Sequence, residues 1–203
     1  MKIICIGRNY AEHAKELNNP VPQQPVFFMK PDTALLKDGA DFYLPDFSAE
    51  IQHELEVVLK ISKAGKHIDE AFAANYYDEI GLGIDFTARD LQQECKSKGL
   101  PWEIAKAFDG SAPIGKFIPK AQLGNLDALN FHLEINGETR QSGTTADLLF
   151  RFDQIIAYVS RFVTLKTGDL IYTGTPSGVG PVKIDDQLKG FLGEECLIQF
   201  SVR

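Results

Sequence analysis

The sequence contains little of what disulfide-rich, zinc-binding or membrane-spanning proteins need. Its 203 residues include only three cysteines, Cys5, Cys95 and Cys196, which are far apart and odd in number. We therefore expect neither a disulfide framework nor a zinc site, and we interpret all three as small buried apolar residues. No apolar run approaches the roughly 20 residues that a membrane-spanning helix needs, so a membrane partner is not expected.

Signals for export, for repeats and for nucleotide binding are also missing. The apolar run at residues 3–6 is too short for a secretory signal, which favours a cytoplasmic location. No internal repeat, low-complexity segment or domain boundary interrupts residues 1–203, so the chain is predicted to form a single domain. The glycine- and proline-rich segment 173–181 lacks the Gly-Lys-Ser/Thr sequence of a phosphate-binding loop, although its amide and hydroxyl groups could hold a carboxylate.

An excess of positive charge is absent as well. The formal net charge is -7 and the pI is about 5.1. Nucleic acids and anionic membranes need a basic face, so neither is predicted to be a partner. With 44% hydrophobic and 24% charged residues, the composition is that of an ordinary soluble globular protein. An acidic surface still allows a cationic pocket for a small acidic substrate.

The spacing of the apolar residues predicts more strands than helices. Asn136 and Gly137 separate two alternating segments and are a strong signal for a hairpin. Asn9 and Thr87 are suited to cap the first two helices. Helices are expected at residues 9–17, 86–96 and 152–163, and strands at residues 3–6, 26–30, 53–59, 79–85, 102–108, 131–135, 138–141 and 197–202. Residues 165–172 are expected to form a turn followed by a strand.

Two carboxylates in the predicted strand 53–59 form the first candidate site. On a strand, Glu54 and Glu56 point to one face while Leu55 and Val57 point to the other. Like charges this close raise each other's pKa unless a cation neutralises them, and Mg²⁺, Mn²⁺ and Ca²⁺ prefer such oxygen ligands. A solvated strand face without any function would show the same spacing. The metal hypothesis therefore depends on the rest of the chain.

A histidine and a glutamate form the second candidate site. His13 and Glu16 are three residues apart in the predicted helix 9–17, and are therefore neighbours on its surface. A carboxylate beside an imidazole raises its basicity and fixes its orientation, as a general base that activates water requires. An exposed contact on a surface helix has the same spacing.

A third group of candidates follows the predicted strand 79–85. This strand ends at Asp85, and the next helix carries Arg89 and Gln92 on its polar side, an arrangement that often lines a pocket but that a solvated helix also shows. In the predicted strand 102–108, Lys106 shares a face with three apolar side chains. A buried ammonium needs an anionic partner, so Lys106 is paired in the core, faces a site, or extends to solvent.

Together these segments resemble the fumarylacetoacetate hydrolase family, in its short branch of acylpyruvases and oxaloacetate decarboxylases. The resemblance extends over nearly the whole chain, and so many ordered blocks are far more specific than any one of them. The blocks are Gly7-Arg8-Asn9-Tyr10, His53-Glu54-Leu55-Glu56, Asp85-Phe86-Thr87-Ala88-Arg89-Asp90, Lys98-Gly99-Leu100-Pro101-Trp102, Lys106 and Thr173-Gly174-Thr175-Pro176-Ser177-Gly178-Val179-Gly180.

The resemblance implies a β-rich α+β fold, a mixed β-roll or sandwich with a few peripheral helices, and a homodimer. His13 and Glu16 resemble a water-activating pair, and Lys106 resembles the catalytic lysine of the family. The implied ligands of Mg²⁺ or Mn²⁺ are Glu54, Glu56 and Asp85. The implied substrate contacts are Arg89, Gln92, Gly174, Thr175 and Lys30. Larger family members have one more metal-binding aspartate, so here water and substrate are expected to fill the remaining positions.

The implied activity is hydrolysis of a C–C bond in acylpyruvate-type 2,4-dioxo acids, such as acetylpyruvate or fumarylpyruvate, through a metal-stabilised enolate. Water deprotonated by His13 would attack the distal carbonyl. Oxaloacetate decarboxylation and keto–enol tautomerisation need the same metal and Lys106, and remain alternatives. A catalytically silent metal- or ligand-binding protein is an alternative of another class. The partner expected for any of the enzymes is a small 2-oxo acid.

Overall fold

The computed structural model describes residues 1–16, 20–37 and 39–203. Its α-helices are α1 (Ala11–Glu16), α2 (Glu70–Ala73), α3 (Arg89–Lys98), α4 (Glu103–Lys106) and α5 (Phe152–Ser160). Its strands are β1 (Ile3–Gly7), β2 (Val26–Lys30), β3 (Leu35–Leu36), β4 (Ile51–His53), β5 (Leu55–Ile61), β6 (Tyr77–Ile84), β7 (Thr87–Ala88), β8 (Ala112–Pro119), β9 (Asn130–Ile135), β10 (Glu138–Thr144), β11 (Leu170–Tyr172), β12 (Gly180–Pro181), β13 (Gln187–Leu192) and β14 (Glu195–Ser201).

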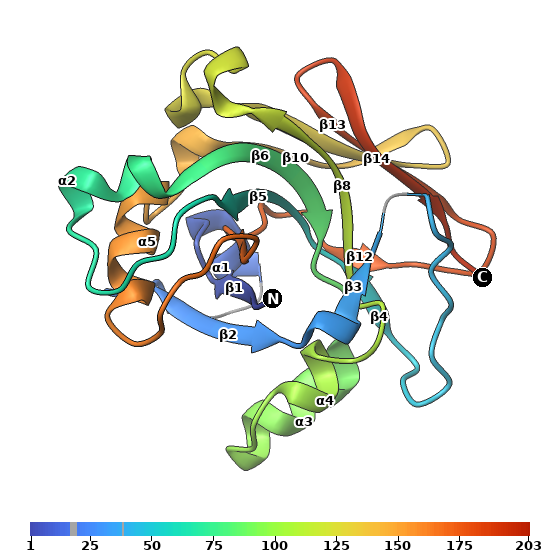
Figure 1. Ribbon diagram of the computed structural model, residues 1–203. Coiled ribbons are helices and arrows are strands. Elements are labelled where there is room, and N and C mark those ends of the chain that lie inside the picture. Colours follow the sequence, from blue (N-terminus) through green and yellow to red (C-terminus); the bar gives the residue numbers. More distant parts are fainter. Residues whose placement is uncertain (17–19, 38) are drawn as a thin grey trace.

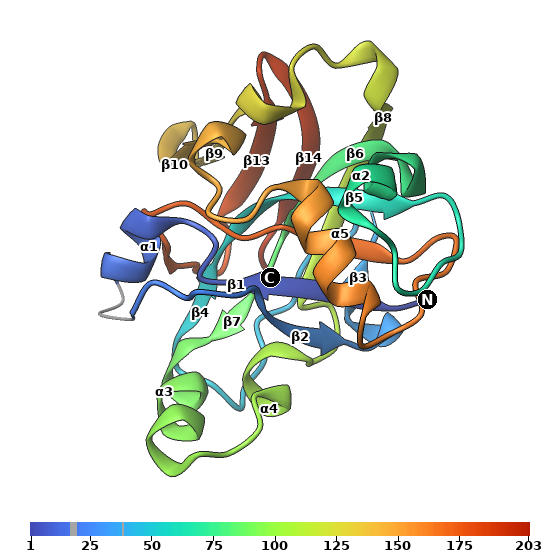
Figure 2. The same ribbon diagram turned by 90° about the vertical axis from the view of Figure 1, so that its left-hand side faces the viewer.

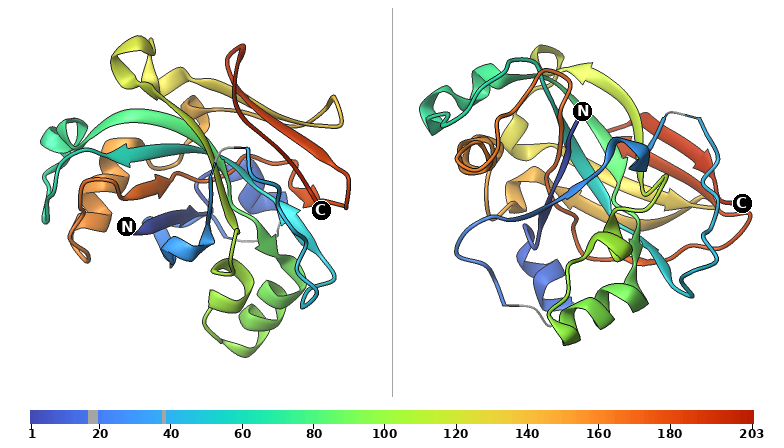
Figure 3. Two further views of the ribbon diagram at one scale, coloured as in Figure 1. Left: turned by 45° about the vertical axis from the view of Figure 1, so that its right-hand side comes forward. Right: turned by 60° about the horizontal axis from the view of Figure 1, so that its bottom comes forward.

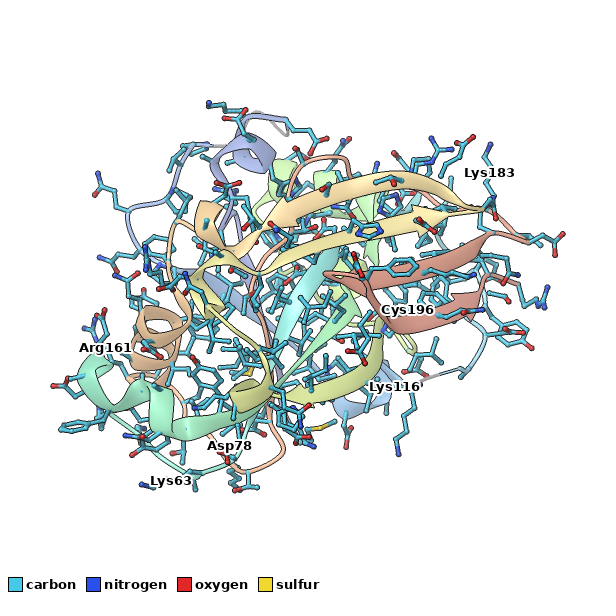
Figure 4. The ribbon with its side chains drawn as sticks, turned by 90° about the horizontal axis from the view of Figure 1, so that it is seen from above. Lys63, Asp78, Lys116, Arg161, Lys183 and Cys196 are labelled. Carbon is cyan, nitrogen blue, oxygen red and sulfur yellow. The ribbon has the colours of Figure 1, made fainter. Side chains whose placement is uncertain are left out.

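The strands form three sheets, and this confirms the predicted β-rich α+β class. A curled sheet of seven strands has the order β2-β1-β11-β5-β6-β8-β3, with parallel pairing at β1–β11 and at β3–β8. A second sheet has the order β10-β9-β13-β14 and is seen face-on in Figure 4. A small third sheet, β12-β4-β7, lies beside the candidate carboxylates. The helices lie around these sheets, with α3 and α4 together at one end and α2 and α5 at another (Figure 1).

The main core lies between the seven-stranded and the four-stranded sheets. Strand β5 is the central strand that is buried on both faces, and apolar residues from β5, β6, β9 and β13 join one cluster. The two sheets approach closely at Gly190 of β13, where a Cβ atom would lie 3.2 Å from Leu55 of β5, and 2.6 Å from Ile198 on the neighbouring strand β14. A side chain at position 190 would therefore push the two sheets apart. Figure 3 shows the arrangement of the sheets from two further directions.

Several predicted elements are confirmed. Asn136 and Gly137 connect β9 to β10 with φ angles of 56° and 81°, the left-handed pair that a tight hairpin turn needs. The predicted strand 79–85 corresponds to β6, and the predicted helix 152–163 corresponds to α5, which ends at Ser160. Cys5 and Cys95 are buried as expected, whereas Cys196 on β14 is only partly buried (Figure 4). None of the helices in the described part of the chain is long and apolar enough to cross a membrane.

The predicted strand 102–108 is wrong, because this segment forms the short helix α4. The amides of Ala105 and Lys106 donate to the carbonyl oxygen of Trp102, which closes a helical turn. Alternating apolar residues suggested a strand, but alanine, lysine and glutamate favour a helix. Pro101 precedes the helix and has no amide hydrogen for a sheet.

Two further predictions are corrected at element ends. The predicted strand 53–59 is broken at Glu54, between β4 and β5. Thr87 belongs to β7 and does not cap α3, since its hydroxyl donates to the carbonyl oxygen of Asp85. Asn9 does not act as the predicted cap either, because its side chain bonds Thr173 and both backbone groups of Phe150. The predicted end of the first helix, Leu17, lies outside the described residues.

Candidate active site

Three carboxylates meet at the point where β5 begins and β6 ends. Glu54 precedes β5, Glu56 lies within it, and Asp85 follows β6. Each offers an oxygen within 4.8 Å of the other two, and all three side chains are buried. The amide of Asp85 donates to the carbonyl oxygen of Glu54 at 2.8 Å, which holds the two strand ends together. The predicted set of metal ligands is thus brought together, and the alternative of a solvated strand face does not apply.

Lys106 lies between two of these carboxylates. Its Nζ is 2.8 Å from an oxygen of Glu54, 2.8 Å from an oxygen of Asp85 and 2.5 Å from the hydroxyl of Thr87. Burial alone would lower the pKa of Lys106, but Asp85 and Glu54 outweigh burial and raise it. Burial likewise opposes the ionised form of Glu54, yet Lys106 and Arg89 hold the pKa of Glu54 well below its usual range. Both groups are therefore charged at neutral pH.

Glu56 has no such cation beside it. Among the described residues its carboxylate has no ion-pair partner, and it accepts one hydrogen bond, from the amide of Gly174 at 2.6 Å. Burial, together with the charges of Asp85 and Glu54, raises the pKa of Glu56 well above its usual range. A cation bound here would relieve this repulsion.

The three carboxylates fit a hard divalent cation. They supply oxygen atoms only, as Mg²⁺ and Mn²⁺ prefer, and no thiol or imidazole belongs to the group. One oxygen of Asp85 also has no hydrogen-bond partner among the described groups, although the Nζ of Lys30 lies 2.8 Å from it without hydrogen-bond geometry. The carboxylate of Glu56, which has no ion-pair partner among the described residues, is the group that a metal ion would neutralise.

Lys30 and Gly174 contact the carboxylates of Asp85 and Glu56. The Nζ of Lys30 is fully buried and donates to the carbonyl oxygens of Phe86 and Ser111 as well as contacting Asp85. The amide of Gly174 is used by Glu56. Both residues were predicted to contact the substrate, but neither lines the pocket. In this structure they position Asp85 and Glu56.

His13 and Glu16 form the predicted pair at the wall of the same pocket. The Nδ1 of His13 lies 3.0 Å from an oxygen of Glu16, whose other oxygen accepts from the amide of Gly178 at 3.0 Å. A carboxylate only accepts here, so Nδ1 of the neutral imidazole carries the hydrogen and Nε2 is left as the basic nitrogen. His13 is only 5% exposed, whereas Glu16 is an exposed residue, so the imidazole is shielded from solvent and its carboxylate partner is not.

The pocket combines these groups with the start of α3. Arg89 donates to Glu54 at 2.5 Å and to the side-chain oxygen of Gln92 at 2.7 Å. Because the oxygen of Gln92 accepts from Arg89, its amide nitrogen remains available as a donor. The pocket residues are Ile6, Gly7, Arg8, His13, Val26, Phe28, Glu54, Glu56, Asp85, Arg89, Gln92, Lys96, Trp102, Lys106 and Thr175. Figure 2 and Figure 3 show how α1 and α3, which carry His13 and Arg89, lie on the same side of the molecule.

Gln141 of β10 was missed by sequence reasoning but fixes the direction of a pocket hydroxyl. Its oxygen accepts from the amide of Leu55, and its nitrogen donates to the carbonyl oxygen of Pro176, so the orientation of the amide is unambiguous. The same nitrogen lies 2.8 Å from the hydroxyl oxygen of Thr175, which must therefore accept. The hydrogen of that hydroxyl is left free to donate into the pocket. No sequence signal marked Gln141.

Arg8, Lys96 and Trp102 also line the pocket and were given no role by sequence reasoning. Arg8 lies in one of the family-like blocks, and its φ of 59° is unusual for a residue other than glycine. Burial, followed by the charges of Arg89 and Arg8, lowers the pKa of Lys96 to about 8. The pocket lining thus carries four cationic side chains, those of Arg8, Arg89, Lys96 and Lys106, beside the three carboxylates, although the chain as a whole is acidic.

Comparisons with known proteins agree with this geometry. "Oxaloacetate tautomerase FAHD1, mitochondrial" of Mus musculus is 43% identical over 201 residues, which are 99% of this chain and 91% of that protein. "Oxaloacetate decarboxylase, mitochondrial" of Dictyostelium discoideum is 41% identical over 203 residues, 99% of this chain and 93% of the relative. The names place both relatives in mitochondria, and the cytoplasmic location expected here stays a prediction.

A solved structure and a family model complete the comparison. Fumarylpyruvate hydrolase from Pseudomonas aeruginosa, in complex with Mn²⁺ and pyruvate, superimposes with a TM-score of 0.92 at 36% identity, covering 100% of this chain and 88% of that one. The model of the fumarylacetoacetate (FAA) hydrolase C-terminal domain matches residues 2–199. The chain therefore belongs to the fumarylacetoacetate hydrolase family, whose members include tautomerases, decarboxylases and hydrolases.

Proposed function

We propose that the chain is an oxaloacetate tautomerase that interconverts the keto and enol forms of this acid at a divalent-metal site. The observation that carries the proposal is Lys106, held between Glu54 and Asp85 in a pocket with cationic walls. Such a pocket suits an acid whose reaction develops negative charge on oxygen. The relatives named for oxaloacetate support this substrate over the acylpyruvates expected from the sequence.

The metal would be held by Glu54, Glu56 and Asp85, and we expect Mg²⁺ or Mn²⁺. When bound, the ion would supply a Lewis acid that makes the 2-oxo group easier to enolise. The Mn²⁺ of the fumarylpyruvate hydrolase complex supports a metal in this family. Gln92 and Thr175 each keep a free donor hydrogen for the oxygen atoms of the substrate. The ammonium of Lys106 stabilises negative charge that develops on the C2 oxygen.

His13 moves the proton. In the direction from keto to enol, its Nε2 takes a proton from C3, the electrons of that C–H bond form the C2=C3 double bond, and the electrons of the C2=O double bond move onto the C2 oxygen, which then takes the same proton back from the His13 imidazolium. No atom is gained or lost, so one base and one oxygen-stabilising group suffice. Glu16 stabilises the imidazolium that forms, and Gly178 holds Glu16 in place.

Hydrolysis of acylpyruvates is the second candidate, and the His13–Glu16 pair is the observation that favours it. The same base could deprotonate a water molecule instead of C3. Decarboxylation of oxaloacetate needs no base, because the bond to the leaving CO₂ supplies the electrons of the enolate. The three reactions therefore differ in how strongly they depend on His13.

The products separate these candidates. The purified protein, loaded with Mg²⁺ or Mn²⁺, is incubated with oxaloacetate or acetylpyruvate, with and without a chelator, and enol absorbance, pyruvate and CO₂ are measured. The proposal predicts metal-dependent loss of enol absorbance from oxaloacetate without matching pyruvate. Pyruvate and CO₂ at the same rate would identify a decarboxylase, and pyruvate from acetylpyruvate would identify a hydrolase. Stoichiometric metal binding without any turnover would identify a silent binding protein and overturn the proposal.

A further inference from the structure

Two cations in the pocket wall are not matched by any acid. Two of the three carboxylates are paired with cations, since Lys30 contacts Asp85, Arg89 contacts Glu54 and Lys106 contacts both, and the third, Glu56, is left to the metal. Within the described ranges, the side chains of Arg8 and Lys96 form no ion pair and no hydrogen bond, although both line the pocket. Their charge is therefore available to a ligand.

The environment of these two side chains is costly without an anion. Arg8 directly follows β1 and holds a left-handed backbone conformation, which costs free energy at a residue other than glycine. Lys96 is a solvent-exposed residue whose ammonium lies near two further cations, Arg89 and Arg8, whose charges oppose its own. Strain and charge repulsion of this kind collect where a ligand offsets them.

The wall around Lys96 also selects the shape of the ligand. The ring of Trp102 lies under the ammonium, with 5.6 Å between Nζ and the ring centroid. An indole face packs well against the flat carbon skeleton of a small acid, and Arg8 and Lys96, which line the same pocket, take its charged end. A neutral acyl group would leave both cations unpaired.

We propose that Arg8 and Lys96 bind the second carboxylate of a dicarboxylic 2-oxo acid, the group that distinguishes such acids from acylpyruvates with a neutral tail. The inference rests on the proposed function, because it assumes that the first carboxylate and the 2-oxo group face the Glu54, Glu56 and Asp85 cluster. It assigns the choice of substrate to two residues that do not touch the reacting atoms.

The test compares oxaloacetate with its 4-methyl ester, which has the same 2-oxo acid end but no charge at C4. Arg8→Asn keeps a residue that tolerates a positive φ, and Lys96→Met keeps the length of the side chain. Each variant is expected to raise KM for oxaloacetate about tenfold to a hundredfold and to leave KM for the ester within about threefold, because only the acid loses a charge-assisted hydrogen bond.

The matched control is Lys98→Met on the same helix. Lys98 is exposed and pairs with Glu94 at 2.6 Å, so its loss should change neither KM for oxaloacetate nor KM for the ester. If Arg8→Asn and Lys96→Met raise KM for the acid and for the ester equally, or raise neither, the subsite is refuted.

A binding measurement separates this inference from the proposed function. Trp102 is the single tryptophan of the chain and lines the pocket, so its fluorescence reports the dissociation constants of both compounds without turnover. If the wild type converts neither compound, the proposed function fails. The subsite then stands if the acid binds at least tenfold more tightly than the ester and Lys96→Met removes that difference. It fails if the two compounds bind equally to the wild type.

Discussion

One hydrogen-bond donor in the pocket depends on a residue that does not line it. Gln141 obliges the hydroxyl of Thr175 to accept, and so directs the hydroxyl hydrogen toward the substrate. Gln141→Met removes this constraint. We expect KM for oxaloacetate to rise about threefold to tenfold, as for the loss of one well-placed hydrogen bond.

A double-mutant cycle distinguishes this positioning role from a structural one. In the Thr175→Val background, Gln141→Met should change KM no further, because there is no hydroxyl left to direct. An equal rise in both backgrounds would show that Gln141 only supports the fold. Thr175→Ser keeps the hydroxyl and should behave like the wild type.

The charge of Lys96 makes a prediction about pH. Burial, Arg89, Arg8 and Lys106 lower the pKa of Lys96 to about 8, against the attraction of Glu54. The ammonium is therefore charged below about pH 8 and becomes neutral above it. KM for oxaloacetate should rise as the pH increases through 8, whereas KM for the 4-methyl ester should stay level. A rise of equal size in the Lys96→Met variant would contradict the assignment.

Sequence reasoning identified those site residues whose chemistry is marked by local spacing. Glu54 and Glu56 alternate on one segment, and His13 and Glu16 are one helical turn apart. Gln141 accepts a hydrogen bond from the amide of Leu55, 86 residues away in the sequence, and the residues next to Gln141 do not predict that contact. Polar residues whose roles depend on contacts between distant segments cannot be recognised from spacing alone.

At the scale of elements, the segment 173–181 joins the parts of the site. Its amides at Gly174 and Gly178 hold the carboxylates of Glu56 and Glu16, and Thr175 faces the pocket. The sequence predicted that this segment could hold a carboxylate, and the carboxylates it holds belong to the chain itself. The loop thus links the metal cluster to the proton-transfer pair.

Gly174→Ala tests how much the close packing of this loop against Asn9 contributes to stability. Gly174 has a φ of 106°, and a Cβ atom there would lie 2.7 Å from the Cβ of Asn9. We expect the free energy of unfolding, measured by urea denaturation, to fall by about 1–3 kcal/mol. Gly193→Ala is the control, because Gly193 has a φ of 60° and no atom of the described residues lies within 4 Å of its Cβ position. A loss at Gly174 no larger than that at Gly193 would show that the close approach to Asn9 is unimportant.

Helix α4 shows why an apolar alternation can mislead over a few residues. Lys106, at the end of this single helical turn, contacts the carboxylates. Trp102, the residue immediately before the helix, lines the pocket. In a strand both would also have shared one face. The two arrangements differ in the backbone hydrogen bonds, which the side-chain pattern does not report.

At the scale of the whole molecule, the fold class followed from the sequence but the strand order did not. Strand β1 pairs in parallel with β11, so that Ile3 faces Leu170 across the length of the chain. Such pairing depends on how the sheet closes and not on local spacing. The homodimer implied by the family resemblance stays a prediction for a measurement of mass in solution.

We propose that this acidic chain encloses a metal-assisted site for moving a proton on oxaloacetate. The most direct test is the rate at which enol oxaloacetate becomes the keto form, followed by absorbance with Mg²⁺ or Mn²⁺, for the wild type and for His13→Gln. We predict a metal-dependent rate in the wild type and a loss of about a hundredfold to ten-thousandfold in the variant, as for removal of a general base. An unchanged rate in His13→Gln, or a wild-type rate that a chelator does not lower, would contradict the account.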